Sequence, residues 1–272
     1  MGSPFNVLRH QTMKTVVITG STRGIGYGMA HEFLQRGHQV MISGRSADTS
    51  EKAAQSLAAK HDAARIGHYA CEVADYAQVQ ALWDAAVQRF GKIDLWINNA
   101  GVTTYNENFS DVKPEDIRAI VETNSIGMMY GSHVALRGMQ KQGGGQIYNM
   151  EGLGSDGMIR PSTLVYGSTK YGLRYFTKGL SQQVKGTPVQ VGYLSPGIVA
   201  TDMMAQSSSG EDLKNNRILN ALADRVETVT PWLVENMLNN TQNGAAFRWL
   251  TTRKVYERFF RAFVLREKRQ VF

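Results

Sequence analysis

Residues 15–26 read Thr15-Val-Val-Ile-Thr-Gly20-Ser-Thr-Arg-Gly24-Ile-Gly26. The first half is a β-branched, apolar run that predicts a strand, and the residues that follow place Met29, Phe33 and Leu34 on one face of a predicted helix. A glycine turn between a strand and a helix lets the backbone approach a pyrophosphate, to which the helix N-terminus offers N–H donors. We therefore expect this loop to bind a dinucleotide through Gly20, Ser21, Thr22, Arg23, Gly24, Ile25 and Gly26.

The rest of the chain alternates between apolar β-rich runs and helical patterns. We expect further strands over residues 39–43, 66–71, 93–97, around 147–148 and over 189–194, and helices over 49–60, 76–90, 114–140 and 163–184. Such alternation implies an α/β fold with a single Rossmann-type domain, a doubly wound parallel sheet flanked by helices. We assign 1–13 to an N-terminal extension, 14–250 to this domain and 251–272 to a basic amphipathic C-terminal tail.

The composition limits the cellular compartments in which the protein could function. A single cysteine, Cys71, excludes an internal disulfide and fits a reducing environment. No apolar run approaches the roughly 20 residues of a membrane-spanning helix, and residues 1–14 lack the apolar core of a secretory signal. We therefore expect a protein that is not secreted and that is soluble or peripheral to a membrane.

The net charge of +7 is concentrated at one end, because residues 252–272 contain seven basic and two acidic residues. A nucleic-acid-binding protein usually spreads its basic residues over a binding face. We therefore expect no nucleic-acid partner, and we assign no metal ligands.

The second predicted strand is followed by Gly44-Arg45-Ser46. In a Rossmann-type fold this position contacts the adenosine ribose, where an acidic residue binds the 2′-hydroxyl of NAD. Arg45 instead suits the 2′-phosphate of NADP, and Arg23 is a second candidate phosphate ligand. Each arginine alone is typical of a solvated surface, but the two together favour NADPH as the cofactor.

Residues 149–170 leave a predicted strand through a glycine-rich stretch and end in Tyr166 and Lys170, which lie on one face of the predicted helix. A free tyrosine loses its proton near pH ~10, and a neighbouring ammonium makes the phenol a better proton donor. The pair suits proton transfer to a carbonyl oxygen while the carbonyl carbon accepts hydride. Tyrosine and lysine at this spacing are also common on surface helices, so the companion motifs carry the assignment.

Five motifs occur in order: Thr19-Gly20-x-x-x-Gly24-Ile25-Gly26, Asn98-Asn99-Ala100-Gly101, Asn124, Tyr166-x-x-x-Lys170 and Pro196-Gly197. Their order and spacing resemble the short-chain dehydrogenase/reductase family over residues 14 to about 204. The resemblance implies that Tyr166 is the catalytic acid/base, that Lys170 binds the nicotinamide ribose and assists Tyr166, and that Asn124 holds a water of the proton relay. It also implies cofactor contacts by Glu72, Val73, Asn99, Ala100, Gly101, Pro196, Gly197, Val199 and Thr201.

The catalytic serine of most family members has no direct counterpart here. Counting five residues from Ile147 reaches Gly152, and counting thirteen back from Tyr166 reaches Leu153. Neither residue carries a hydroxyl. Ser155 is our candidate for the catalytic hydroxyl, and Ser162 is the alternative.

The surrounding motifs are Asn149-Met150-Glu151-Gly152-x-Gly154-Ser155 and Val165-Tyr166-Gly167-Ser168-Thr169-Lys170-x-Gly172-Leu173-Arg174. They are similar to one branch of the family, the chlorophyll(ide) b reductases. This similarity implies a lipophilic, chlorophyll b-like pigment whose 7-formyl group is reduced by NADPH to 7-hydroxymethyl, and a location in the cytoplasm or on the stromal side of a plastid membrane. Ser155 and Tyr166 would then bond the developing alkoxide.

Two other functions fit the same residues. One is an NADPH-dependent reductase of another lipophilic ketone or aldehyde. The other is a non-catalytic NADPH-binding scaffold, which the missing serine permits but which intact Tyr166, Lys170 and Asn124 argue against. We expect a homo-oligomer that dimerises through the long helices. The chain's end lacks the glycine-rich strand of many tetrameric relatives, which argues against a homotetramer.

Residues 203–243 follow the Pro-Gly turn, after which this fold usually covers its substrate, so we expect a mobile lid there. The alternative is that its helical part, near residues 229–238, is a plain packed helix.

The tail repeats apolar residues near helical spacing, at Val255, Phe259, Phe260, Phe263 and Val264. A helix would gather them into one stripe beside Arg258, Arg261 and Arg266. Such a stripe suits peripheral contact with an anionic membrane. Packing against the protein's own body or against a second subunit is the alternative.

Overall fold

The computed structural model describes residues 12–104, 108–205, 216–267 and 269–272. Most of the predicted N-terminal extension and residues 206–215 of the predicted lid lie outside this part of the chain. No helix within it combines the length and the apolar character needed to cross a bilayer.

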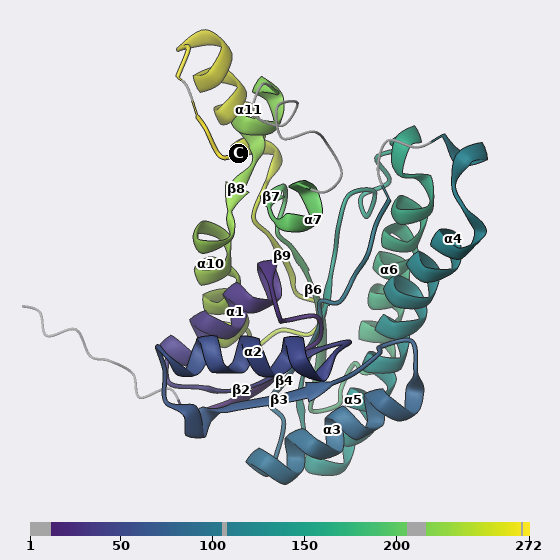
Figure 1. Ribbon diagram of the computed structural model, residues 1–272, viewed down its shortest axis with the longest axis vertical. Helices are drawn as coiled ribbons and strands as arrows, with labels where there is room; N and C mark the ends of the chain where they lie inside the picture. Colours follow the sequence, from purple (N-terminus) through teal and green to yellow (C-terminus); the bar gives the residue numbers. More distant parts are fainter. Residues whose placement is uncertain (1–11, 105–107, 206–215, 268) are drawn as a thin grey trace, which may run out of the picture.

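A parallel sheet in the order β3-β2-β1-β4-β5-β6-β9 is the centre of the described structure (Figure 1). The strand order reverses between β1 and β4, which is the point at which doubly wound sheets bind ligands. The predicted fold class is therefore confirmed. The strands are β1 (Thr15–Ile18), β2 (Gln39–Gly44), β3 (Ile66–Ala70), β4 (Leu95–Asn98), β5 (Gly145–Met150), β6 (Val189–Ser195) and β9 (Ala246–Arg248).

Helices cover both faces of this sheet (Figure 1). One face carries α1 (Gly24–Gln35), α2 (Ala47–Ala58) and α10 (Val226–Asn239). The other carries α3 (Tyr76–Phe90), α4 (Pro114–Val121), α5 (Met128–Gln142) and α6 (Leu164–Gln183). The remaining described α-helices are the short α7 (Asp202–Ala205) and α9 (Arg217–Leu222) and the C-terminal α11 (Thr252–Phe259).

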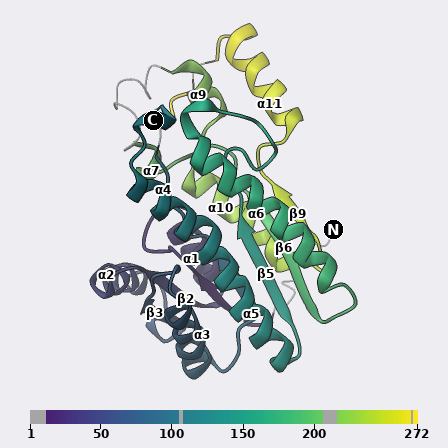
Figure 2. The ribbon, with the colours of Figure 1, turned by 90° about the vertical axis from the view of Figure 1, so that its right-hand side faces the viewer.

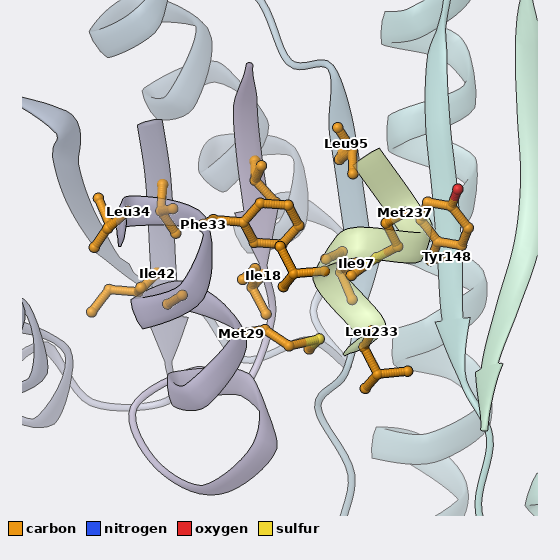
Figure 3. Packing of buried hydrophobic residues seen from close by; sticks show 14 of the residues in the cluster. Ile18, Met29, Phe33, Leu34, Ile42, Leu95, Ile97, Tyr148, Leu233 and Met237 are labelled. Carbon is orange, nitrogen blue, oxygen red and sulfur yellow. The ribbon is translucent and has the colours of Figure 1, made fainter. Parts of the chain in front are cut away.

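Alternate strand residues supply two separate cores. In β1, Val16 and Ile18 join the cluster under α1 and α10, whereas Val17 joins the cluster under α3 and α5. Figure 3 shows the first cluster, to which α1 contributes Met29 and α10 contributes Leu233. The sheet is thus buried on both sides, which explains why its strands are continuous apolar runs.

The α10 helix belongs to this core. Val229, Leu233, Val234 and Met237 are fully buried. The predicted lid does not extend over this helix, and the packed-helix alternative describes it. The cause is its apolar face, which is covered by α1.

The long helix predicted over residues 114–140 is divided. A π-helical turn, Glu122–Gly127, separates α4 from α5. Within this turn the Asn124 side chain faces inward and exchanges hydrogen bonds with the Val102 backbone. Single π turns of this kind often occur at functional sites.

Strand β9 was not among the strands predicted from the sequence. Its backbone pairs with β6, and flanking bonds run from Tyr193 N to Ala245 O (3.0 Å) and from Trp249 N to Ser195 O (2.9 Å). The strand has only three residues, Ala-Phe-Arg, and the sequence has no glycine-rich or alternating pattern there that would predict it.

The C-terminal tail folds back onto a buried carboxylate, Asp224. Arg258 and Arg269 each place Nη2 within 2.8–2.9 Å of this carboxylate, and Trp249 Nε1 donates to it at 2.6 Å. Asp224 begins β8 (Asp224–Arg225), which pairs with β7 (Val199–Ala200). Figure 2 shows α11 and α9 at the end of the molecule beyond the sheet.

The tail's predicted apolar stripe is split in two. Val255 and Phe259 are half-buried, whereas Phe260, Phe263 and Val264 are exposed. The split arises because the helix turns Arg258 toward Asp224, so the residues on the far side of α11 and of the π-helical turn Phe260–Val264 face solvent.

Candidate active site

One cavity of about 1180 Å³ lies at the carboxyl ends of the parallel strands. It exceeds the ~300–1,000 Å³ typical of a single small-molecule pocket, so it has room for a dinucleotide and a second molecule. Most of the predicted cofactor residues line it: Gly20, Thr22, Arg23, Gly24, Ile25, Gly26, Arg45, Glu72, Val73, Asn99, Ala100, Gly101, Tyr166, Lys170, Pro196, Gly197, Val199 and Thr201.

The glycine loop fits a pyrophosphate. Gly20 has a φ of +61°, and a Cβ there would lie 2.7 Å from Ala100 Cα, so only glycine suits both the turn and the close approach. Asn99 Nδ2 holds the loop by donating to Thr19 O and Gly20 O, each at 2.9 Å. No side chain caps the first turn of α1, which leaves N–H donors for an anion.

Ser21 is the exception within the loop. Its hydroxyl donates to Ile18 O at 2.6 Å and accepts from Ser43 N at 2.9 Å, and the residue is fully buried. It joins the ends of β1 and β2 and is not among the residues that line the cavity. Its predicted cofactor contact stays a prediction that this geometry does not support.

The predicted adenosine end of the cavity has one basic side chain more than the sequence predicted, Lys52, whose Nζ also lies 2.9 Å from Asp48 Oδ2. Arg23 and Arg45 both line it, and Lys52 joins them from α2. Thr49 and Ser56 of the same helix also line the cavity, so their spacing with Lys52 marks one helical face. The helical spacing of Thr49, Lys52 and Ser56 could have suggested Lys52 as a binding residue. The sequence alone, however, does not show which face of α2 turns toward the ligand.

Tyr166 and Lys170, the predicted proton donor and its partner, lie together on the wall of the cavity, at what we call its reactive end. Both are buried, with 9% and 4% of their surface exposed, and both line the cavity. Lys170 Nζ lies 5.6 Å from the centroid of the Tyr166 ring and donates to Met150 O at 3.0 Å. Burial lowers the pKa of Lys170 to about 8, and the charge of Glu151 opposes this shift.

Asn124 lies behind this pair and is not among the residues that line the cavity. Its Oδ1 accepts from Val102 N at 2.9 Å, while Nδ2 donates to Val102 O (2.9 Å) and to Thr169 Oγ1 (3.2 Å). The side chain therefore ties the loop after β4 to α6. Its predicted water contact stays a prediction.

Gly152 occupies the position where the family's serine was counted. A Cβ there would overlap the Tyr166 hydroxyl, so in this arrangement no larger residue fits beneath the phenol. Ser155 is buried in the same turn, where its Oγ accepts from Gly152 N at 3.0 Å. Ser155 does not line the cavity, whereas Ser162 and Thr163 do.

These positions lead to a prediction about the missing hydroxyl. We expect Ser162→Ala to lower kcat for aldehyde reduction by roughly tenfold, through loss of a hydrogen bond to the developing alkoxide, and Ser155→Ala to act mainly by loosening the turn. Steady-state kinetics and thermal unfolding of both variants provide the check. A large kcat loss for Ser155→Ala at unchanged stability would restore Ser155 as the catalytic hydroxyl.

Glu151 lies beside Lys170 and forms a buried ion pair. Its carboxylate accepts from Arg174 Nε at 2.5 Å and from Nη2 at 2.8 Å, and its side chain has no exposed surface. The Arg174 guanidinium stacks 5.5 Å from the Tyr193 ring centroid. This pair fixes the residue that follows β5 against α6, next to Gly152 in the chain.

The segment after β6 completes the opposite wall. Gly197, Val199 and Thr201 line the cavity, and β7 is held from outside by β8, with Asp224 N donating to Ile198 O at 2.9 Å. Leu219 of α9 also lines the cavity. The described residues contain no cluster of histidine, cysteine or carboxylate side chains suited to a metal ion.

The sequence matches the family model for short chain dehydrogenases over residues 14–212, which is more than half of the chain. Together with the Rossmann-type sheet, this match shows that the chain belongs to the short-chain dehydrogenase/reductase family of oxidoreductases. Such enzymes use a nicotinamide dinucleotide as their cofactor.

Two plant proteins are among the similar sequences. The chain is 36% identical over 258 residues to the probable chlorophyll(ide) b reductase NYC1 of Arabidopsis thaliana, covering 89% of this chain and 51% of that protein. It is 35% identical over 269 residues to the chlorophyll(ide) b reductase NOL of Oryza sativa subsp. japonica, covering 96% and 75%. The chain thus spans about half the length of the first and three quarters of the second. Both are described as chloroplastic.

A solved structure shares the fold. The 3-ketoacyl-(acyl-carrier-protein) reductase of Brucella melitensis, complexed with NADH, superposes with a TM-score of 0.77 at 24% identity, over 89% of this chain and 98% of that one. The likeness agrees with the architecture derived above.

Proposed function

We propose that the chain is an NADPH-dependent reductase of a bulky lipophilic aldehyde, and that its substrate is the 7-formyl group of a chlorophyll(ide) b-like pigment. The observation that carries the reductase function is the buried pair of Tyr166 and Lys170 on the wall of a cavity large enough for two ligands. The substrate class rests on the similarity to NYC1 and NOL.

The chain's residues supply binding and a proton. When bound, the cofactor would supply hydride to the carbonyl carbon. Tyr166 would give its phenolic proton to the carbonyl oxygen, so that the aldehyde gains one hydride and one proton and becomes a primary alcohol. The Lys170 ammonium would stabilise the phenolate left on Tyr166 and bind the nicotinamide ribose.

A large apolar substrate suits the lining beyond this pair. Leu153, Ile198, Met204 and Leu219 all line the cavity. Methionine and leucine side chains adapt to a flat apolar surface without demanding a fixed hydrogen-bond pattern. Arg160 lies at the same wall and supplies a cation for a polar group of the substrate.

The test is NADPH oxidation by the purified chain against chlorophyllide b, a panel of other aldehydes and a panel of lipophilic ketones. We expect turnover of chlorophyllide b with formation of the 7-hydroxymethyl product. Turnover of ketones alone would favour the alternative enzyme, a reductase of lipophilic ketones. NADPH binding without any turnover would favour a scaffold and reject the proposal.

The proposed cofactor preference leads to a specific prediction for Arg45. We expect Arg45→Ala to weaken NADPH binding by about ten- to hundredfold and NADH binding by less than about twofold, because a charge-assisted bond to the 2′-phosphate is lost. Titration of both cofactors provides the measurement, and Lys60→Ala, an exposed base that does not line the cavity, is the matched control. Equal losses for the two cofactors would contradict the assignment.

We also propose a homo-oligomer that assembles through the long helices. Exposed apolar side chains gather there, at Val121 of α4, Met129 of α5, and Leu164, Tyr171 and Tyr175 of α6. The chloroplastic relatives support a location on the stromal side of a plastid membrane or in the cytoplasm of a cell that holds such pigments.

A further inference from the structure

The outward side of the C-terminal helix carries an unusual concentration of exposed apolar residues. We call it the tail face and define it by Tyr256, Phe260, Phe263, Val264 and Leu265, which are 43–72% exposed. The first four stand at i, i+4, i+7 and i+8 along α11 and the π-helical turn that follows it, and each of them is exposed. Contiguous apolar surface of this kind marks an interaction site more often than scattered single residues do.

The tail face is held in place from behind. Arg258 and Arg269 are bonded to Asp224, Ala262 is buried, and Arg217 Nη2 donates to Ala262 O at 2.9 Å. The Arg217 guanidinium also lies 5.0 Å from the centroid of the Phe263 ring. The aromatic side chains therefore project from an anchored helix, because its inner side is already used for docking.

Positive charge surrounds the tail face. Arg253, Arg261 and Arg266 are exposed, and the acidic residues among residues 252–272 are Glu257 and Glu267. Arg261 Nε lies 3.6 Å from Glu257 Oε1, in a pair that is more than half exposed on both sides and therefore contributes little. A two-fold contact between copies of the chain would bring this positively charged face against itself. An anionic surface is the complementary partner.

The tail face lies near the cavity through α9. Leu219 lines the cavity, its neighbour Ile218 is 53% exposed, and their helix α9 packs against α11. A surface bound by the tail face would therefore lie near the wall of the cavity that α9 forms. Apolar side chains beside arginines are the pattern of helices that lie in the plane of a membrane interface.

We propose that the tail face binds an anionic phospholipid bilayer, with its aromatic and aliphatic side chains in the acyl boundary and Arg261 and Arg266 on headgroup phosphates. This binding goes beyond the proposed reductase function and does not depend on which carbonyl compound is reduced. Each arginine at an anionic surface strengthens binding by roughly fivefold, and salt screens the effect.

The experiment is co-sedimentation of the full chain with phosphatidylcholine vesicles and with vesicles that contain about 30 mol% phosphatidylglycerol, at about 50 mM and about 300 mM NaCl. We expect binding to the anionic vesicles only, weakened at the higher salt. Arg261→Gln/Arg266→Gln and Phe260→Ser/Val264→Ser should each lower the partition coefficient by roughly tenfold or more. All four side chains are exposed, so both double variants should keep the thermal midpoint of the parent.

Two matched controls separate the tail face from general surface effects. Lys60→Gln/Lys141→Gln removes the same charge elsewhere, and Phe109→Ser removes an exposed aromatic ring from the turn Phe109–Asp111; both should keep the partition coefficient within about twofold. Equal binding to neutral and anionic vesicles, no binding to either, or an equal loss in the controls would overturn the proposal. So would conversion of a dimer to a monomer by Phe260→Ser/Val264→Ser, because a second copy would then cover the face. Sedimentation needs no turnover, so a failure of the reductase assay leaves this result independent.

Discussion

Tyr166→Phe should bind NADPH as the parent does and lose about a thousandfold in kcat. The substitution removes only the hydroxyl, and the proton donation that it provides is worth ~10²–10⁴ in rate. The phenylalanine ring keeps the packing against Lys170, whose ammonium lies 5.6 Å from the ring centroid. Stopped-flow single turnover with a saturating aldehyde separates this loss from any change in product release.

The matched control for this variant is Tyr69→Phe, which removes a hydroxyl from a half-buried residue of β3 that does not line the cavity. It should leave kcat within about twofold, because substitutions away from the site's special features usually have small effects. If Tyr166→Phe kept turnover within about tenfold of the parent, the proton would have to come from another group. The hydroxyls of Ser162 and Thr163, which also line the cavity, would be the next candidates.

Glu151→Gln should be the most destabilising single change near the site. It breaks a bidentate ion pair and leaves the Arg174 guanidinium, whose side chain is only 15% exposed, without its carboxylate. Loss of one partner of a buried pair costs about 3–5 kcal/mol, and we expect the lower end because the Arg174 side chain keeps some contact with solvent. Chemical denaturation gives the measurement, with the exposed pair variant Glu122→Gln as the control.

The same variant should change the pH profile. The charge of Glu151 raises the pKa of Lys170 against the dominant effect of burial, which sets it at about 8. Removing that charge therefore lowers the pKa of Lys170 further, and the alkaline limb of kcat moves to lower pH because the ammonium is lost earlier. If Glu151 had only a structural role, Glu151→Gln would lower stability but would leave the alkaline limb of the kcat profile at the same pH.

A double variant tests the energetic argument. Glu151→Leu/Arg174→Met replaces both charges with apolar groups, and buried pairs replaced in this way often lose little stability. It should recover more than half of the free energy of unfolding lost by Glu151→Gln. If the double variant were less stable than the single one, the pair would contribute net stabilisation beyond avoiding an unpaired charge.

Elements with local signals were predictable from the sequence. The predicted bounds of α3, residues 76–90, match the structure because Asp75 caps its first turn and Gly91, with a φ of +87°, ends it. Strand β1 was equally clear, since its buried apolar run meets a glycine turn. By contrast, β9 exists only because the open edge of β6 accepts it, and an edge is a property of the assembled sheet.

The candidate site shows the same division. Motif spacing pointed to Tyr166, Lys170 and the glycine loop, and all of these residues except Ser21 line one cavity. Spacing did not show that Ser21 and Ser155 turn away from it, because a hydroxyl on a tight turn can bond the backbone or a ligand equally well. The pairing of Glu151 with Arg174 spans 23 residues and depends on β5 lying against α6.

The Asp224 carboxylate has a consequence for the order of events during synthesis. Its partner Arg269 follows it by 45 residues, so at ~5–20 residues per second the ribosome supplies that arginine roughly 2–9 s later. Until then a nascent chain holds an acid without this partner beside β7, whose Val199 lines the cavity. The strands up to β6 can therefore pair early, whereas β9 and the ion pairs that hold Asp224 of β8 beside β7 are completed last, by residues beyond those that the family model spans.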